Sequence, residues 1–181
     1  MVFTQKNKNM FLELAKKRFS CRSYMKKEVE KEKVMQIMEA ARIAPSASNK
    51  QPWFFYVVQN DKAILSKVHE TYHREWFSEA PVVIIACADK NQAWKRSFDG
   101  KNHAEIDTSI AIDHITLAAT DLGLSTCWIC HFEANKIKDI FDMPEHLEPI
   151  ALIPLAYCNN ESDLERFDKQ RKSIDEITKF I

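Results

Sequence analysis

Glycine is so scarce in this chain that the shortage limits which nucleotide-binding folds it can adopt. Only Gly100 and Gly123 occur in 181 residues, and neither belongs to a G-x-G-x-x-G or Walker loop. Both loops need glycine because the backbone must come close to a phosphate. The sequence therefore argues against a Rossmann site or a P-loop. Any phosphate bound by this chain is expected to be held by side chains.

Composition predicts one globular domain spanning residues 1–181, with no nucleic-acid or membrane partner. The chain is 45% hydrophobic and 29% charged, which is typical of globular rather than disordered proteins. Its 26 basic and 26 acidic residues cancel, so a surface that coats nucleic acid is disfavoured. No apolar run approaches the roughly 20 residues that a membrane span needs.

The N-terminus and the cysteines together predict a reducing, cytoplasmic location. The segment "MVFTQKNKNMFLELAKKR" lacks the long apolar core of a secretory signal and instead suggests a short amphipathic helix. Five cysteines without such a signal are expected to be free thiols.

Hydrophobic patterning predicts an irregular mixture of helices and strands, which favours an α+β or three-layer α/β fold. Helices are expected at 34–44, 61–77, 103–122, 133–141 and from about 173, and strands at 53–58, 81–88, 124–130 and 150–157. Pro45 and Gly123 are expected to end two of the helices. Pro154 suggests an edge strand or a bulge, because proline cannot donate to a strand ladder.

Two short basic segments are candidates for holding an anion. In "RFSCR", Arg18, Ser20 and Arg22 alternate, so in an extended segment two guanidiniums and a hydroxyl can point the same way. In "KQRKS", Lys169 and Arg171 repeat this spacing. The alternative for either segment alone is a solvated charged patch, which is the more common case.

The loop "APSASNKQPW" lies between an expected helix and a buried strand, where it can present polar groups from a rigid frame. Ser46, Asn49 and Gln51 can offer donors and acceptors to a flat heterocycle, and Pro45 can pack on its face. The alternative is an ordinary turn built from proline, serine and asparagine.

The stretch "CWICH" could mark haem attachment, a redox dithiol or half of a zinc site. In a strand, Cys127 and Cys130 are three residues apart and face opposite sides, which disfavours a disulfide between them. No second C-x-x-C supplies the other two zinc ligands. Structural thiols are the favoured interpretation, a redox role is the second, and no metal site is predicted.

Six landmarks in order, taken together, resemble the FMN-dependent nitroreductase family over nearly the whole chain. They are "RFSCRSY", "APSASNKQPWFFYVV", "EAPVVIIACAD", "DTSIAIDHITLAATDLGLSTCWIC", "EPIALIPLAY" and "KQRKSIDEI". The resemblance implies a mainly antiparallel sheet flanked by helices in three layers. It also implies an intertwined homodimer with FMN at the interface.

The resemblance further implies which residues bind FMN. They are Arg18, Ser20, Arg22, Lys169 and Arg171 at the phosphate or ribityl chain, Pro45, Ser46, Asn49 and Gln51 at the isoalloxazine from the partner chain, and Cys130, which stands near the flavin where many members have glycine. The implied reaction is ping-pong hydride transfer from NAD(P)H through flavin N5 to nitroaromatics or quinones. No catalytic side chain is nominated, because the flavin carries the chemistry.

Three alternatives stay open beside this reading. The first is a relative with the same fold that carries out reductive dehalogenation or flavin breakdown. The second is a flavin-binding or regulatory protein with little turnover. The third is a thiol-redox protein that uses Cys127 and Cys130.

Overall fold

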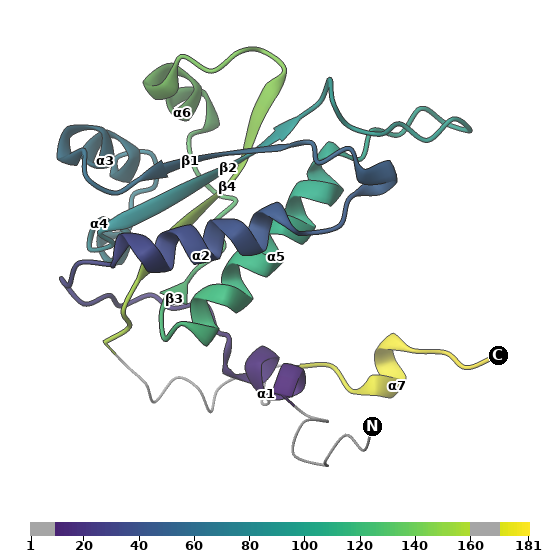
Figure 1. Cartoon of the computed structure of the whole chain (residues 1–181), viewed down its shortest axis with the longest axis horizontal. Coiled ribbons are helices and arrows are strands. Elements are labelled where there is room, and N and C mark those ends of the chain that lie inside the picture. The colour runs from purple at the N-terminus through teal and green to yellow at the C-terminus, as the bar shows by residue number, and fades with distance from the viewer. Residues whose placement is uncertain (1–9, 160–170) are drawn as a thin grey trace.

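The centre of the fold is an antiparallel sheet with the strand order β1-β2-β4-β3. The computed structural model describes residues 10–159 and 171–181 of the chain. The strands are β1 (Trp53–Val58), β2 (Val82–Asp89), β3 (Ser125–Thr126) and β4 (Leu147–Ala156). Strands β2 and β4 lie in the middle of the sheet (Figure 1), and β1 forms one of its edges.

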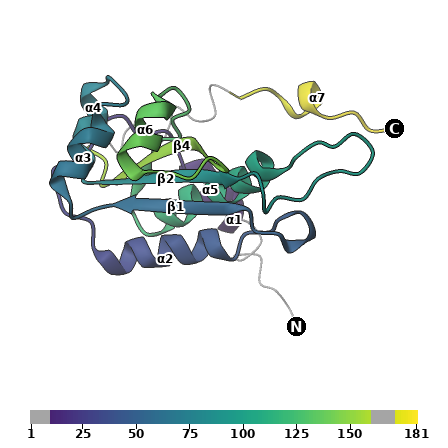
Figure 2. The same cartoon turned by 90° about the horizontal axis from the view of Figure 1, so that it is seen from above.

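Helices cover both faces of this sheet. The α-helices of the described residues are α1 (Met10–Lys17), α2 (Lys31–Arg42), α3 (Lys62–His69), α4 (Glu75–Ser78), α5 (Ala104–Asp121), α6 (Ala134–Phe141) and α7 (Ile174–Ile177). Figure 2 shows α2 on one side of the sheet and α3, α4 and α6 on the other. Helix α5 packs against α2 and contributes to the same core. The predicted three-layer α+β fold is therefore confirmed.

Strand β2 explains why the sheet needs cover on both sides, because all eight of its residues are buried. Ile84 and Ala86 enter the core beneath α2 and α5. Val83 and Ile85 enter the second core, beneath α3, α4 and α6. This alternation follows from the two-residue period of a strand. A strand that is apolar on both faces can be buried only between two layers.

The helix predicted over 61–77 is wrong as a single element, because a turn divides it into α3 and α4. Asp61 caps the start of α3 by accepting hydrogen bonds from the backbone N–H groups of Ala63 and Ile64. At its other end, the buried Thr71 hydroxyl donates to the Val68 carbonyl over 2.7 Å. The Thr71 carbonyl accepts from the Glu133 N–H, so it is turned toward α6 and not along a helix.

The prediction of an edge strand or bulge at Pro154 is also wrong, because β4 is an inner strand. Its register shift lies between Ala86 and Cys87 of β2, several residues from Pro154. An inner strand can contain Pro154 because the neighbouring segment, predicted as a strand over 124–130, pairs with β4 only in part. It pairs at Ser125–Thr126 and again at Ile129, and it leaves a gap between them. The missing N–H of Pro154 falls in this gap.

Candidate functional site

The segment that carries "RFSCR" lies along β3. Ser20 forms a parallel bridge with Thr126, and the Cys21 N–H donates to the Thr126 carbonyl over 3.0 Å. The extended backbone expected for this segment is therefore present at that point. It places the predicted anion ligands beside the first residues of "CWICH".

The Cys127 thiol lies beside all three of these predicted ligands. Burial raises the pKa of the Cys127 thiol, while the Arg22 guanidinium, a hydrogen bond with Ser20 and the Arg18 guanidinium act in the opposite direction. Arg18, Ser20 and Arg22 are therefore all within electrostatic or hydrogen-bonding range of the Cys127 thiol, and their binding of one anion stays a prediction. We call these three residues the basic cradle.

The basic cradle has the donor set of an anion site. In the described ranges neither Arg18 nor Arg22 forms an ion pair with a carboxylate, so both positive charges remain available to a ligand. The Arg22 side chain is exposed, and its Nη1 atom lies 3.4 Å from the Ser20 carbonyl oxygen. Guanidinium groups bind phosphate through paired N–H donors without help from a glycine-rich loop.

The loop "APSASNKQPW" connects α2 to β1 in an unusual backbone conformation. Ser48, Asn49 and Gln51 have φ angles of 49°, 54° and 49°, in the left-handed region that favours glycine. The Ser46 hydroxyl accepts from the Gln51 N–H over 2.8 Å and stabilises the turn. Strained backbone of this kind is often kept at binding sites. Pro45, Asn49 and Gln51 are exposed and can reach a ligand.

Asp107 anchors this loop, and sequence reasoning did not identify it. Its Oδ1 atom accepts from the Ala47 N–H over 3.1 Å. The residue is 2% exposed, and its Oδ2 atom has no hydrogen-bond partner among the described residues. The available signal was a carboxylate next to the apolar residues of a largely buried helix, because burying a charged group costs free energy unless it has a partner.

The loop and the basic cradle lie near opposite ends of α5. Asp107 holds the loop at the first turn of α5, whereas the Leu124 N–H bonds to Ala119 in its last turn and leads directly into β3. Figure 1 shows the same separation. The 12 residues that separate Asp107 from Ala119 correspond to about 18 Å along the helix axis. A single FMN molecule would have to bridge this length to contact both segments of the same chain.

Of the remaining predicted site residues, Cys130 is exposed and Arg171 is exposed at the start of the C-terminal arm, 171–181. Lys169 lies outside the described residues. Cys127 is buried, so the two thiols of "CWICH" differ sharply in their surroundings, as the strand periodicity predicted. Among the described residues, no group of three or more His, Cys, Asp or Glu side chains is placed to hold a metal ion.

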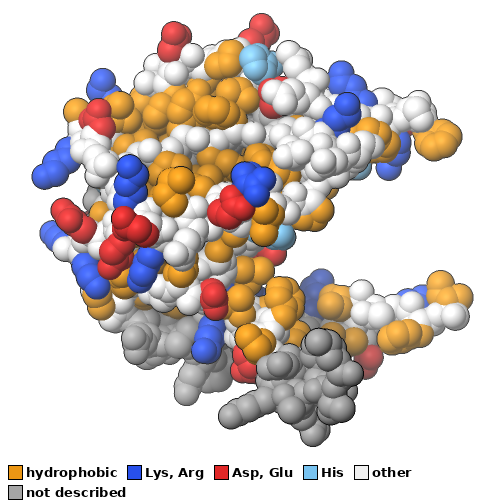
Figure 3. Space-filling model, in the orientation of Figure 1, with side chains coloured by type: hydrophobic (Ala, Val, Ile, Leu, Met, Phe, Trp, Pro, Cys, Tyr) orange, Lys and Arg blue, Asp and Glu red, His pale blue; other side chains and the backbone are white. Residues whose placement is uncertain are grey.

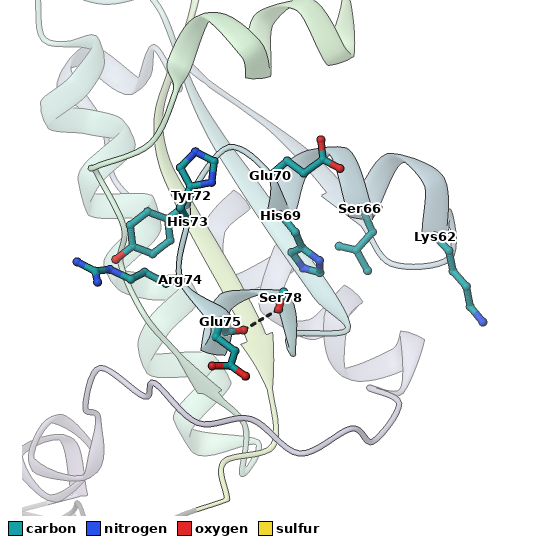
Figure 4. Close-up of a pocket in the computed structure, with 10 residues that line it drawn as sticks. Lys62, Ser66, His69, Glu70, Tyr72, His73, Arg74, Glu75 and Ser78 are labelled. Carbon is teal, nitrogen blue, oxygen red and sulfur yellow. Dashed lines mark hydrogen bonds between the residues drawn. The ribbon is translucent and has the colours of Figure 1, made fainter.

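A hollow of about 550 Å³ lies between α3 and α4, away from any predicted site residue. Figure 4 shows that its labelled polar side chains come from α3, the turn after it, and α4. Burial lowers the pKa of His69 in this hollow. The Nε2 atom of His69 is buried without a hydrogen-bond partner in the described structure.

Comparison with known proteins identifies the family to which this chain belongs. The model of the nitroreductase family matches residues 15–72 and 64–157. The chain belongs to the nitroreductase family. A solved nitroreductase family protein from Clostridium difficile is 41% identical and superposes with a TM-score of 0.87, covering 94% of this chain and 97% of that one.

Three curated relatives show the range of names within this similarity. A Methanothermobacter thermautotrophicus protein provisionally named NADH dehydrogenase/NAD(P)H nitroreductase is 36% identical, over 88% of this chain and 84% of its own. FMN reductase [NAD(P)H] of Bacillus subtilis is 30% identical over 79% and 64%. Iodotyrosine dehalogenase 1 homolog of Caenorhabditis elegans is 28% identical over 97% and 62%.

Proposed function

We propose that this chain is an oxidoreductase whose bound FMN passes a hydride through N5 from NAD(P)H to nitroaromatic, quinone or similar electron-poor acceptors by a ping-pong mechanism. Membership of the nitroreductase family and the names of its relatives support the coarser statement, an FMN-dependent NAD(P)H oxidoreductase. The observation that carries the proposal is the extended segment beside β3, where Ser20 bridges Thr126 and Arg18 and Arg22 lie within electrostatic range of the Cys127 thiol.

The basic cradle fits the phosphate end of FMN. It offers a hydroxyl and two guanidiniums without a carboxylate partner among the described residues, whereas the chain has no glycine-rich loop that could bind a phosphate through backbone amides. In this proposal Arg18 and Arg22 neutralise the phosphate, and Ser20 donates to a phosphate or ribityl oxygen. Lys169 and Arg171 complete the anion site, and Cys130 lies near the flavin.

The loop that holds Pro45, Ser46, Asn49 and Gln51 fits the isoalloxazine of the partner subunit's site. Because Asp107 and Ala119, the two anchor points on α5, are about 18 Å apart along the helix axis, we propose that each FMN takes the cradle of one chain and the loop of another. We therefore propose a homodimer with two shared FMN sites. Asp107 acts in this site as a positioning residue, because it holds the Ala47 N–H and so fixes the path of the loop.

Apolar surface on two parts of the chain supports the dimer. The C-terminal arm projects from the body (Figures 1 and 2) and exposes Ile174, Ile177 and Phe180, the last to 88%. In Figure 3 hydrophobic side chains gather along this arm. The edge strand β1 exposes half of Phe54. A lone chain gains nothing from exposing these side chains, whereas a second copy can bury them.

The rest of the proposal concerns location and domain organisation. A reducing, cytoplasmic compartment agrees with five cysteines that form no disulfide in the described structure. A single FMN-binding domain over 1–181 agrees with the family match, which runs from residue 15 to residue 157. No described helix is long and apolar enough to cross a membrane.

The test is the absorption spectrum of the purified chain, recorded before and after anaerobic addition of NADH or NADPH. Flavin bands that one nucleotide bleaches, and that menadione or a nitrofuran restores, would support the proposal and identify the donor. Bands that neither nucleotide bleaches would favour the flavin-binding alternative. No flavin signal after added FMN would overturn the cofactor assignment.

Reductive dehalogenation is the second candidate, because the iodotyrosine dehalogenase homolog is similar over 97% of this chain. Activity assays on the same protein in its reduced form distinguish the two candidate functions. Iodide release from iodotyrosine at a rate above that of nitrofuran reduction would replace the first candidate with the second.

A further inference from the structure

Cys21 and Cys158 are far apart in the sequence and in contact in the structure. Their Sγ atoms are 2.7 Å apart, although 137 positions separate the residues. The Sγ atom of Cys21 also lies 3.1 Å from the Ser23 carbonyl oxygen. No other thiol–thiol contact is present among the described residues: Cys127 lies within electrostatic range of Cys21 without contacting it, Cys87 contacts Met143, and Cys130 is exposed.

The backbone holds the two thiols in this position. Tyr24 and Cys158 form an antiparallel bridge, and the Met25 N–H donates to the Tyr157 carbonyl over 2.8 Å. The Asn159 N–H donates to the Ser23 carbonyl over 3.1 Å, and its side-chain amide donates to the Tyr24 carbonyl over 2.8 Å. Two thiols held in contact in this way need little backbone movement to become bonded.

The two thiols differ in their access to solvent. Cys21 is fully buried in a small apolar cluster with Tyr24, Ala80 and Ala156. Burial also raises the pKa of the Cys21 thiol, with a further contribution from the Cys158 contact. Cys158 is partly exposed and lines a cavity of about 350 Å³ together with Lys17 and Tyr157. A small oxidant can therefore reach Cys158 but not Cys21.

We propose that Cys21 and Cys158 form a thiol-modification site, at which hydrogen peroxide drives formation of a reversible disulfide. Peroxide first converts the Cys158 thiol to a sulfenic acid and releases one water. The Cys21 sulfur then attacks the Cys158 sulfur, the S–S bond forms, and the sulfenic oxygen leaves with two protons as a second water. A dithiol reductant returns both thiols and becomes a disulfide itself.

The bond would join two segments of functional interest. Cys21 stands between Ser20 and Arg22 of the basic cradle, and Cys158 follows β4. Closing it ties the cradle segment to the exit of the central sheet and constrains a long stretch of the unfolded chain, which raises the thermal midpoint. Such bonds in reducing compartments are usually transient, so the site would report oxidation and would not serve as a permanent staple.

The experiment treats the full-length protein with one equivalent of hydrogen peroxide and analyses it without reduction. The expected result is a chain lighter by two hydrogen atoms, a Cys21–Cys158 cross-linked peptide after digestion, a raised thermal midpoint, and reversal of all three by dithiothreitol. Cys130→Ser is the matched control, because it removes the exposed thiol and should leave the cross-link intact. Cys158→Ser should abolish it.

Two results would overturn the proposal. One is wild-type protein in which Cys158 gains oxygen atoms, as a sulfinic or sulfonic acid, while Cys21 stays a free thiol. The other is a cross-link that Cys130→Ser abolishes, because the disulfide would then involve another pair. Both results are read from the wild-type protein or from an exposed-site variant, so a folding defect in Cys158→Ser cannot mask them.

Discussion

At the scale of single residues, the basic cradle is the feature most open to test, because its two arginines have no carboxylate partner in the described structure. Replacing Arg22 with alanine removes a charge-assisted contact to the proposed phosphate. We expect the Kd for FMN to rise about 10- to 100-fold, the equivalent of about 1.5 to 3 kcal/mol. Fluorescence titration with FMN measures this change.

The controls for Arg22 separate geometry from charge. Arg22→Lys keeps the charge but loses the paired donors, so it should fall between the wild type and alanine. Arg42→Ala removes an arginine that is paired with Glu39 on the exposed face of α2 and should leave the Kd unchanged. Equal Kd values for Arg22→Ala and Arg42→Ala would remove Arg22 from the site.

Asp107 is expected to fix the loop that follows α2. In Asp107→Ala the Ala47 N–H loses its acceptor, which costs about 1 kcal/mol and should raise the hydrogen-exchange rate of that amide roughly fivefold. Asp107→Asn keeps an acceptor oxygen and should keep most of the protection. An unchanged exchange rate in the alanine variant would mean that other contacts hold the loop.

His69 should make stability depend on pH. Burial lowers the folded pKa of His69 below its ordinary value of 6.5, so the unfolded chain binds the proton more readily. Its contribution to stability is therefore complete above about pH 6.5 and is lost as the pH falls through the folded pKa. Urea titrations above and below that pH should show a smaller pH effect in His69→Gln. An equal pH effect in the wild type and in His69→Gln would contradict this role for His69.

At the scale of elements, α5 sets the spacing of the whole site, and its end depends on one glycine. Gly123 has a φ of 74°, and the Gly123 and Leu124 N–H groups bond back to Thr120 and Ala119. These bonds turn the chain from α5 into β3, where the basic cradle lies. If α5 ended at another residue, β3 would be shifted relative to the segment "RFSCR".

Gly123→Ala is expected to lower the free energy of unfolding by about 1 to 2 kcal/mol. A Cβ at this position would meet nothing within 4 Å, so the whole cost is the strain of the left-handed backbone. Asn tolerates this conformation, so Gly123→Asn should cost less. Urea unfolding of the two variants measures the difference, and equal losses would argue against backbone strain as the cause.

At the scale of the whole molecule, the separation of the loop from the cradle predicts how mixed dimers behave. Consider one chain with Arg22→Ala and a second with Ser46→Ala and Gln51→Ala, each of which should bind FMN poorly as a homodimer. If each site takes its cradle from one chain and its loop from the other, a mixed dimer contains one fully wild-type site. Refolding the two chains together should therefore restore FMN binding.

The same experiment can contradict the shared site. If both segments of a chain served the same FMN, every site in the mixed dimer would carry a defect and refolding together would restore nothing. Differently tagged chains, purified in two steps, ensure that only mixed dimers are measured. A sample that elutes as monomers throughout would contradict the dimer itself.

The amino-acid sequence by itself determined the family and the class of fold, and it predicted the residues of the cradle. Each of these depends on local patterns: the two-residue period of β2, the apolar run of α5, and alternating guanidiniums in a chain with almost no glycine. The predictions from the sequence were wrong about the break after α3 and about the position of Pro154 in the sheet. In both cases a contact from a distant segment, Glu133 or β3, decides the local backbone.

Only the tertiary structure decided which distant segments meet. It placed Arg18, Ser20 and Arg22 beside Cys127, buried Asp107 beneath the loop, and brought Cys21 against Cys158. It also put the two segments of the proposed FMN site at opposite ends of one helix. Local patterns carry the period of each element but not the partner that it packs against, because pairing is settled by the burial of all elements at once.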